Sequence, residues 1–207
     1  KLEALRKIEL PTAELVLSEI LENVTRQKDM EANALVLFMR GLRQKDTQEE
    51  ILSFLLDGVH QFHPRVALFA VRGGRFIGWS SRGFSETAAQ NIGACSFSRS
   101  ENPQFEVALE AEEQTALSEF AENSPLQFLR EDETGAWSLL PLKAMRRPVA
   151  LLLTGGTSNR PDAAAVMMGL AAFRLENLAL KILHELSAEQ PKAAPRPAAK
   201  EAVADEV

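Results

Sequence analysis

The stretch RVALFAVRGGRFIGWSSR, residues 65–82, is the part of this sequence that is most informative about its fold. Within it, two short apolar runs, 66–71 and 76–81, flank the glycine pair Gly73 and Gly74. Alternating runs on either side of two glycines are typical of an antiparallel β-hairpin with a two-residue turn. The sequence therefore predicts a hairpin here, and the turn sets which residues lie opposite one another.

The two faces of this hairpin differ in the size of their side chains. Residues that lie opposite one another on paired strands share a face of the sheet. One face then carries large apolar residues, namely Val66, Leu68, Ile77 and Trp79. The other carries Phe69 and Phe76 with Arg82 at its end, and its smaller residues are Ala67, Gly78 and Ser80. We expect the first face to pack tightly against helices and the second to leave room.

A helix is predicted before this hairpin and a second hairpin after it. Thr47 and Glu50 have the spacing of a capping box, an apolar helical face follows them, and Pro64 ends the helix. The second hairpin pairs residues 137–142 with residues 149–154 across a polar loop that contains the two consecutive arginines. Two hairpins of this kind supply the strands of a small antiparallel sheet.

Short elements are predicted in the middle of the chain, and a long helix follows the second hairpin. The middle holds a helix over 85–93, a strand near 95–98, a helix from Pro103 and a strand over 115–118. Pro161 favours the first turn of a helix, and the apolar residues after it recur at helical spacing as far as Leu186.

The first 45 residues are predicted to be helical. Apolar residues recur at helical spacing from Leu15 to Val24 and again from Leu35 to Leu42. The polar run 25–29 interrupts this stripe, so the pattern fits either one long helix with a polar middle or two helices that meet near residue 29. The heptad register is poor, which argues against a long regular coiled coil.

This order of elements, with four local stretches, resembles the GAF domain, a sensor module that is common in signalling proteins. The stretches that carry the resemblance are EEILSFL at 49–55, RGF at 82–84, SLLPL at 138–142 and PVALLLT at 148–154. The resemblance extends over residues 47–186, about two thirds of the chain. The related PAS fold lacks a long C-terminal helix directly after two consecutive strands.

The resemblance implies an α+β fold with a GAF-like central antiparallel β-sheet and with the N- and C-terminal helices on one face. A ligand cavity, when present, would lie on the other face under the middle segment. We therefore predict a helical segment over 1–45, a GAF-like domain over 46–187 and an Ala/Pro-rich tail over 188–207. Such a tail is typical of a linker to a further domain or of a frayed C-terminus. Because the chain begins at Lys1, we expect it to be part of a longer protein.

The composition is that of a soluble globular protein. The 207 residues are 45% hydrophobic and 25% charged, and no uninterrupted apolar run approaches the length of a membrane span. A net charge of −6 argues against a nucleic-acid partner, because phosphates attract basic proteins. The lone cysteine, Cys95, forms no intramolecular disulfide, so we expect a cytoplasmic protein without membrane attachment.

No catalytic constellation stands out, and we predict neither an enzyme nor a bound cofactor or metal. His60 and His63 lie three residues apart at a predicted helix end, where histidine suits the helix dipole, and no third ligand lies nearby. Cys95 has no histidine near it in sequence and is expected to be a half-buried structural thiol. The glycine pair at 155–156 lacks the Gly-Lys-Ser/Thr ending of a phosphate loop and fits a strand-to-helix turn.

The family's own chemistry does not match this chain either. Free-methionine sulfoxide reductases among GAF proteins use several cysteines, whereas this chain has one. Relatives that bind bilins attach them through a cysteine next to a histidine, whereas Ser96 follows Cys95 here. The Asn-Lys-Phe-Asp-Glu signature of relatives that bind cyclic nucleotides is missing from the sequence.

A small-molecule site is predicted on the face with the smaller residues. Phe69 and Phe76 would supply apolar walls, and Gly78 would supply space between them. Ser80, Arg82 and Thr154 would orient the ligand, with Arg82 favouring a carboxylate or a phosphate. Thr154 is included because Ala150, Leu152 and Thr154 form the smaller set of the second hairpin. The alternative is that side chains of residues 85–134 fill this space and that Arg82 is solvated.

These observations predict a non-enzymatic regulatory or sensor module in a cytoplasmic signalling protein, with a small ligand as one mode of control. The alternative is a pure protein–protein assembly scaffold whose GAF-like core is filled and binds no ligand. The terminal helix has one apolar track through Val166, Leu170 and Phe173 and a second through Met167, Leu175, Leu178 and Ile182. One track suffices to pack on a sheet, so we expect a homodimer through helices and a downstream partner reached through the tail.

Overall fold

A computed structural model describes residues 13–111, 113–117, 120, 124–132, 136–158 and 160–189. Its helices are α1 (Ala13–Leu42), α2 (Gln48–His60), α3 (Glu86–Ala94), α4 (Pro103–Glu110) and α5 (Pro161–Glu189), with short 3-10 helices at Arg99–Glu101 and Gln127–Asp132. Its strands are β1 (Arg65–Arg72), β2 (Arg75–Arg82), β3 (Ser96–Ser98), β4 (Thr115–Leu117), β5 (Trp137–Ala144) and β6 (Arg147–Gly155). Residues 1–12 of the predicted helical segment 1–45 and most of the predicted tail lie outside the described residues.

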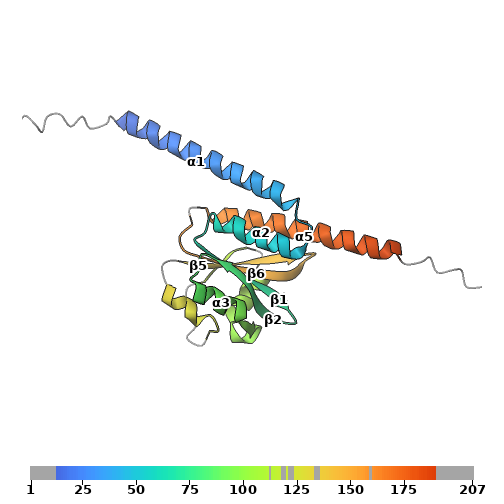
Figure 1. The fold of residues 1–207 in the computed structure, drawn as a ribbon. Coiled ribbons are helices and arrows are strands. Elements are labelled where there is room, and N and C mark those ends of the chain that lie inside the picture. The colour runs from blue at the N-terminus through green and yellow to red at the C-terminus, as the bar shows by residue number, and fades with distance from the viewer. Residues whose placement is uncertain are drawn as a thin grey trace, which may run out of the picture.

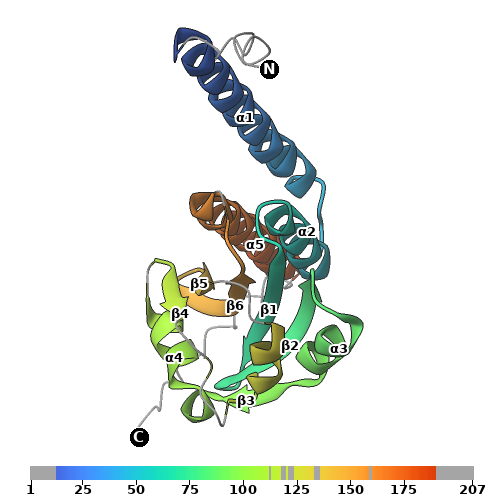
Figure 2. The ribbon, with the colours of Figure 1, turned by 90° about the vertical axis from the view of Figure 1, so that its left-hand side faces the viewer.

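The strands form one six-stranded sheet in the order β3-β2-β1-β6-β5-β4, and each pair of neighbours is antiparallel. Figure 1 shows α2 and α5 lying side by side on one face of this sheet. Figure 2 shows α3 and α4 on the opposite side of the sheet, with α1 rising from the helical layer. The predicted α+β architecture, with the N- and C-terminal helices on one face, is confirmed.

The helical layer packs on the sheet through an apolar core. Helix α2 starts at the predicted capping box, in which the Glu50 backbone N–H donates to Thr47 Oγ1 at 3.2 Å. In return, the Thr47 hydroxyl and the backbone N–H groups of Asp46 and Thr47 donate to the Glu50 carboxylate, and these bonds lower the pKa of Glu50. The α2 side chains Ile51, Leu55, Leu56 and Val59 are fully buried, together with Val66, Leu68 and Leu152 of the sheet.

Helix α1 is one continuous helix, which decides between the two alternatives that the sequence left open. Its C-terminal end is anchored to the domain by Phe38 and Leu42, which are buried against α2 and α5. The rings of Phe38 and Phe54 stack with centroids 5.2 Å apart, and Phe38 packs so closely on Gly58 that no larger residue fits there. The rest of α1 projects away from the domain (Figure 1).

The first hairpin departs from the predicted register near its open end. The pairing is as expected from Arg72↔Arg75 to Phe69↔Gly78, but Leu68 then pairs with Ser80. Trp79 is therefore the extra residue of a β-bulge, and a bulge moves every following residue to the other face. As a result Ser80 and Arg82 lie on the helical face of the sheet.

The turn of the second hairpin is shorter than predicted, and its smaller residues lie on the opposite face of the sheet from the predicted one. A two-residue turn at Met145 and Arg146, with φ of 51° and 61°, replaces the expected loop. Ala150 and Leu152 belong to the core under the helices, whereas Leu151 and Leu153 face the opposite side. Thr154 alternates with them onto the helical face, where it pairs with Val66. The smaller set therefore lies where α5 packs closely on the sheet, not on a roomy face.

One described helix, α5 over Asp162–Ser187, is long and apolar enough to cross a membrane by length and composition. Core helices of soluble proteins meet the same test. The first half of α5 buries Ala164, Met167, Ala171 and Leu175 against the domain, as a core helix does.

Candidate functional site

The face of the sheet opposite the helices holds a cluster of aromatic side chains. Phe69 on β1, Phe76 on β2, Phe97 on β3 and Phe105 on α4 are each fully buried. Their ring centroids lie 5.2–5.9 Å apart in stacked and edge-to-face pairs, which are favourable geometries for aromatic contacts. Phe69 and Phe76 therefore pack against other rings rather than line an open space.

The backbone at the end of α3 packs directly against Gly78. Its backbone N–H donates to the Cys95 carbonyl oxygen at 2.9 Å, which ties β2 to the turn after α3. A Cβ atom at this position would lie 1.6 Å from the carbonyl oxygen of Ile92. Glycine is required here for the close approach of two backbones, and it does not provide room for a ligand.

Arg82 lies on the helical side and is held by protein groups. Its Nε donates to Asp57 Oδ1 on α2 at 2.7 Å, and its Nη1 donates to Ser80 Oγ at 2.9 Å. A third bond, from Nη2 to Ser53 Oγ at 3.4 Å, also reaches α2. The guanidinium already has a carboxylate partner inside the domain, so its role in this structure is to fasten β2 to α2.

The six predicted ligand residues are therefore divided between the two faces of the sheet. Phe69, Phe76 and Gly78 lie on the face with the aromatic cluster, and Ser80, Arg82 and Thr154 lie on the helical face. The prediction that they share one face is wrong, because the bulge at Trp79 and the reversed faces of β6 moved three of them. Ligand binding by either trio stays a prediction.

The titratable residues singled out in the sequence do not assemble into a reactive site. His63 is buried, and within the described part of the chain neither ring nitrogen has a hydrogen-bond partner. Burial lowers the pKa of His63 and raises the pKa of the Cys95 thiol, so both groups are held neutral near pH 7. Among the described residues, no group of three or more His, Cys, Asp or Glu side chains is placed to hold a metal ion.

The helices, in contrast, present an extensive apolar surface to solvent. Of the large hydrophobic residues that are exposed, those on α1 are Leu21, Val36 and Leu37, and those on α5 are Val166, Phe173, Leu180, Ile182, Leu183 and Leu186. Only Val107 on α4 and Met145 in the second hairpin lie elsewhere among the described residues. Most of the exposed large apolar residues among the described ones therefore lie on two helices, which makes these helices the candidate interaction surface.

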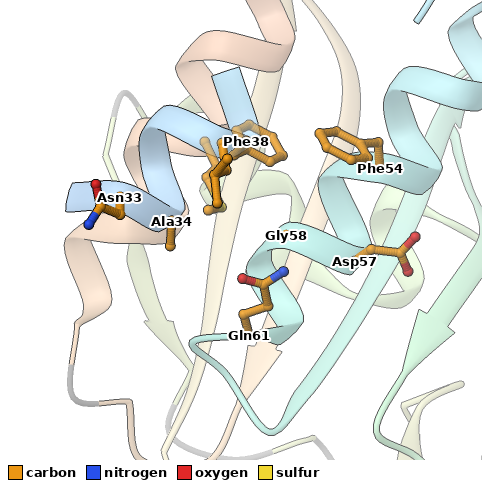
Figure 3. Close-up of a pocket in the computed structure, with 9 residues that line it drawn as sticks. Asn33, Ala34, Phe38, Phe54, Asp57, Gly58 and Gln61 are labelled. Atoms are coloured by element: carbon orange, nitrogen blue, oxygen red, sulfur yellow. The ribbon is translucent and has the colours of Figure 1, made fainter. Parts of the chain in front are cut away.

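Several grooves lined mainly by apolar side chains run along these same helices. The groove in Figure 3, about 340 Å³ in volume, lies between α1 and α2, with Phe38 and Phe54 facing each other at its top. Asn33 and Ala34 border it on the α1 side, and Asp57 and Gln61 on the α2 side. A second groove of about 280 Å³ lies between Leu42 and Phe173, and a third of about 440 Å³ lies beside Leu178 and Ile182.

The signal for this surface was present in the sequence as two apolar tracks on α5, more than one face of a helix needs to pack on a sheet. The members of the second track divide in the structure: Met167 and Leu175 are buried, Leu178 is half-buried and Ile182 is exposed. Of the first track, Val166 and Phe173 are exposed. The exposed residues of α1 were harder to find, because the sequence did not show that α1 leaves the domain.

Comparisons with known proteins identify the fold but no close relative. No family model matches the chain, and no curated protein sequence matches it. Among solved structures, the GAF domain/HD domain protein from Geobacter sulfurreducens is similar over 69% of this chain and 98% of its own, with a TM-score of 0.54 and 11% identity.

Two further structures agree with this result. The GAF domain of a phosphoenolpyruvate-protein phosphotransferase from Coxiella burnetii covers 76% of this chain and 95% of its own, with a TM-score of 0.55 and 14% identity. A segment of a methyl-accepting chemotaxis protein covers 72% of this chain and 99% of its own, with a TM-score of 0.58 and 10% identity. At such low identity the likeness concerns the fold, and the resemblance drawn from the sequence is confirmed at that level.

Proposed function

We propose that this chain, which has the GAF fold, is a non-enzymatic regulatory module of a cytoplasmic signalling protein that acts by self-association through α1 and α5. The observation that carries the proposal is the concentration of exposed large apolar residues on these two helices. Burial of such side chains at a contact between two copies removes apolar surface from water, which is the main driving force of stable association.

The packing of the opposite face supports a module that works without a small ligand. In a GAF-like sensor the middle segment would cover a cavity, but here Phe97 and Phe105 from that segment fill the space beside Phe69 and Phe76. We therefore favour the assembly form of the module over the ligand-binding form. Regulation would then pass along α1 and α5, the helices that lead toward the two ends of the chain.

The experiment compares two glutamate variants by sedimentation velocity of the full chain. Phe173 on α5 is 65% exposed, and Val107 on α4 is 61% exposed, so neither substitution disturbs a packed core. Phe173→Glu should weaken the dimer by about tenfold or more, because it places a charge in an apolar contact. Val107→Glu is the matched control and should leave the dimer unchanged. Equal association of the two variants, or a wild-type chain that is monomeric throughout, would contradict the proposal.

A further inference from the structure

The charges of α1 and the turn after it are segregated along the chain. Residues 13–24 contain three glutamates, Glu14, Glu19 and Glu22, and no basic residue. Residues 34–45 contain three basic residues, Arg40, Arg43 and Lys45, and no acidic residue. The middle, residues 25–33, holds two residues of each sign. Helix α1 and the turn after it therefore carry together about −3 at the free end and +3 at the anchored end.

This segregation determines how two copies of α1 can lie side by side. In a parallel pair the two acidic segments adjoin each other, and so do the two basic segments, which is repulsive at both ends. In an antiparallel pair each acidic segment adjoins a basic one, and the attraction occurs twice because of the two-fold symmetry. The helix dipoles also favour the antiparallel arrangement.

The N-terminal half of α1 is rich in apolar residues. Its sequence holds Leu15, Val16, Leu17, Ile20, Leu21 and Val24, and the Leu21 side chain is 63% exposed. The backbone of this half projects beyond the domain in Figures 1 and 2. Because helices in proteins gain most of their stability from packing of an apolar face, a partner helix would stabilise this half of α1.

A groove that such a partner helix would border lies beside the anchored half of α1. The groove of Figure 3 is lined by apolar side chains that include Phe38, Phe54 and Met167. Leu37, which also lines the groove, is 64% exposed. The groove follows residues 33–38 of α1, which belong to the part of the helix that an antiparallel partner would cover with its N-terminal half.

From these observations we infer that α1 pairs antiparallel with α1 of a second copy, whose acidic N-terminal half lies along the anchored half of α1. This inference rests on the proposed function, since it specifies how α1 takes part in the association of the two copies. Aligning residues 13–24 with residues 34–45 places the two-fold axis at residue 29. Lys28 then lies close to the partner's Glu31, so that the polar middle of the helix is also paired.

Cysteine crosslinking tests the direction of the pair. In a Cys95→Ser background, Lys28→Cys lies near the two-fold axis, with an offset of about 3 Å along the helix between the two copies. Gln44→Cys, in the turn after α1, lies far from the axis, because the end of the helix at Leu42 is already offset by about 39 Å between the two copies. A short bis-maleimide should therefore link two Lys28→Cys chains and fail to link two Gln44→Cys chains. A dimer in which Gln44→Cys crosslinks as well overturns the antiparallel pair and leaves the proposed function standing, whereas a monomeric wild type overturns both.

Charge reversal tests the cause of the pairing. Changing Glu14 and Glu19 to lysine, or Arg40 and Arg43 to glutamate, makes the adjoining segments alike in sign and should weaken the dimer about tenfold. Both pairs of changes in one chain restore opposite signs and should recover most of the lost affinity. If the variant with all four substitutions associates no better than either variant with two, the inference is overturned. A variant with two substitutions that associates more tightly than the wild type also overturns it.

Discussion

Replacement of Gly78 by alanine should destabilise the domain strongly, because the backbone of α3 occupies the space that the new methyl group needs. The added Cβ would lie 1.6 Å from the Ile92 carbonyl oxygen and 2.7 Å from its carbonyl carbon. Backbone atoms cannot rotate away as a flexible side chain does, so the end of α3 must move. Overpacking of this kind costs about 1–3 kcal/mol, and loss of the hydrogen bond from Gly78 N–H to Cys95 adds about 1 kcal/mol.

The expected total is a loss of about 3 kcal/mol in the free energy of unfolding, or roughly 6–12 °C in Tm for a domain of this size. Urea denaturation followed by far-UV circular dichroism measures it, with Gly93→Ala as the matched control. Gly93 lies in α3, and its added methyl group meets no atom within 4 Å. That variant should gain about 0.5–1 kcal/mol from reduced freedom of the unfolded chain. Equal stability of the two variants would refute the argument, since it would mean that β2 is open at Gly78.

Three further predictions concern the helical face, the buried histidine and the second hairpin. Arg82→Ala should cost about 1–2 kcal/mol in urea denaturation, and Asp57→Asn less than about 1 kcal/mol, because the ion pair is partly exposed while Arg82 also bonds serine oxygens. Burial lowers the pKa of His63, so the unfolded state takes up the proton first and stability should fall as the pH drops below about 6.5. In His63→Phe the difference in Tm between pH about 7.5 and about 5.5 should therefore be smaller than in the wild type. An unchanged difference would mean that His63 does not cause the loss of stability. Met145→Asn with Arg146→Gly should raise stability by about 1 kcal/mol, because both positions have positive φ, and a lower Tm would contradict this.

Local chemistry in the sequence was sufficient to predict most elements of the fold. The spacing of Thr47 and Glu50 located the start of α2, because few side chains can form a capping box. Gly73 and Gly74 located the first turn, because both positions have positive φ, which few residues other than glycine adopt. The order of the elements then led to the antiparallel sheet with helices on one face. These features depend on neighbours in sequence, which is why they could be predicted.

The candidate site depended on tertiary packing, and the sequence pattern did not contain it. The bulge at Trp79 adds one residue to an otherwise regular alternation, and it transferred Ser80 and Arg82 to the helical face. In β6, the small size of Ala150 reflects close packing under the helices rather than space for a ligand. In α1, the polar run 25–29 is compatible with a helix that lies in solvent, so it did not mark a break.

The mass of the full chain in solution shows whether two copies associate, as self-association through α1 and α5 requires. Static light scattering over a dilution series, from tens of micromolar downward, gives this mass without any variant. The proposed dimer should have twice the chain mass of 22.8 kDa at the upper end of the series and should dissociate on dilution. A constant mass of 22.8 kDa at every concentration would contradict it, because the apolar residues of α1 and α5 would then remain exposed in the working protein.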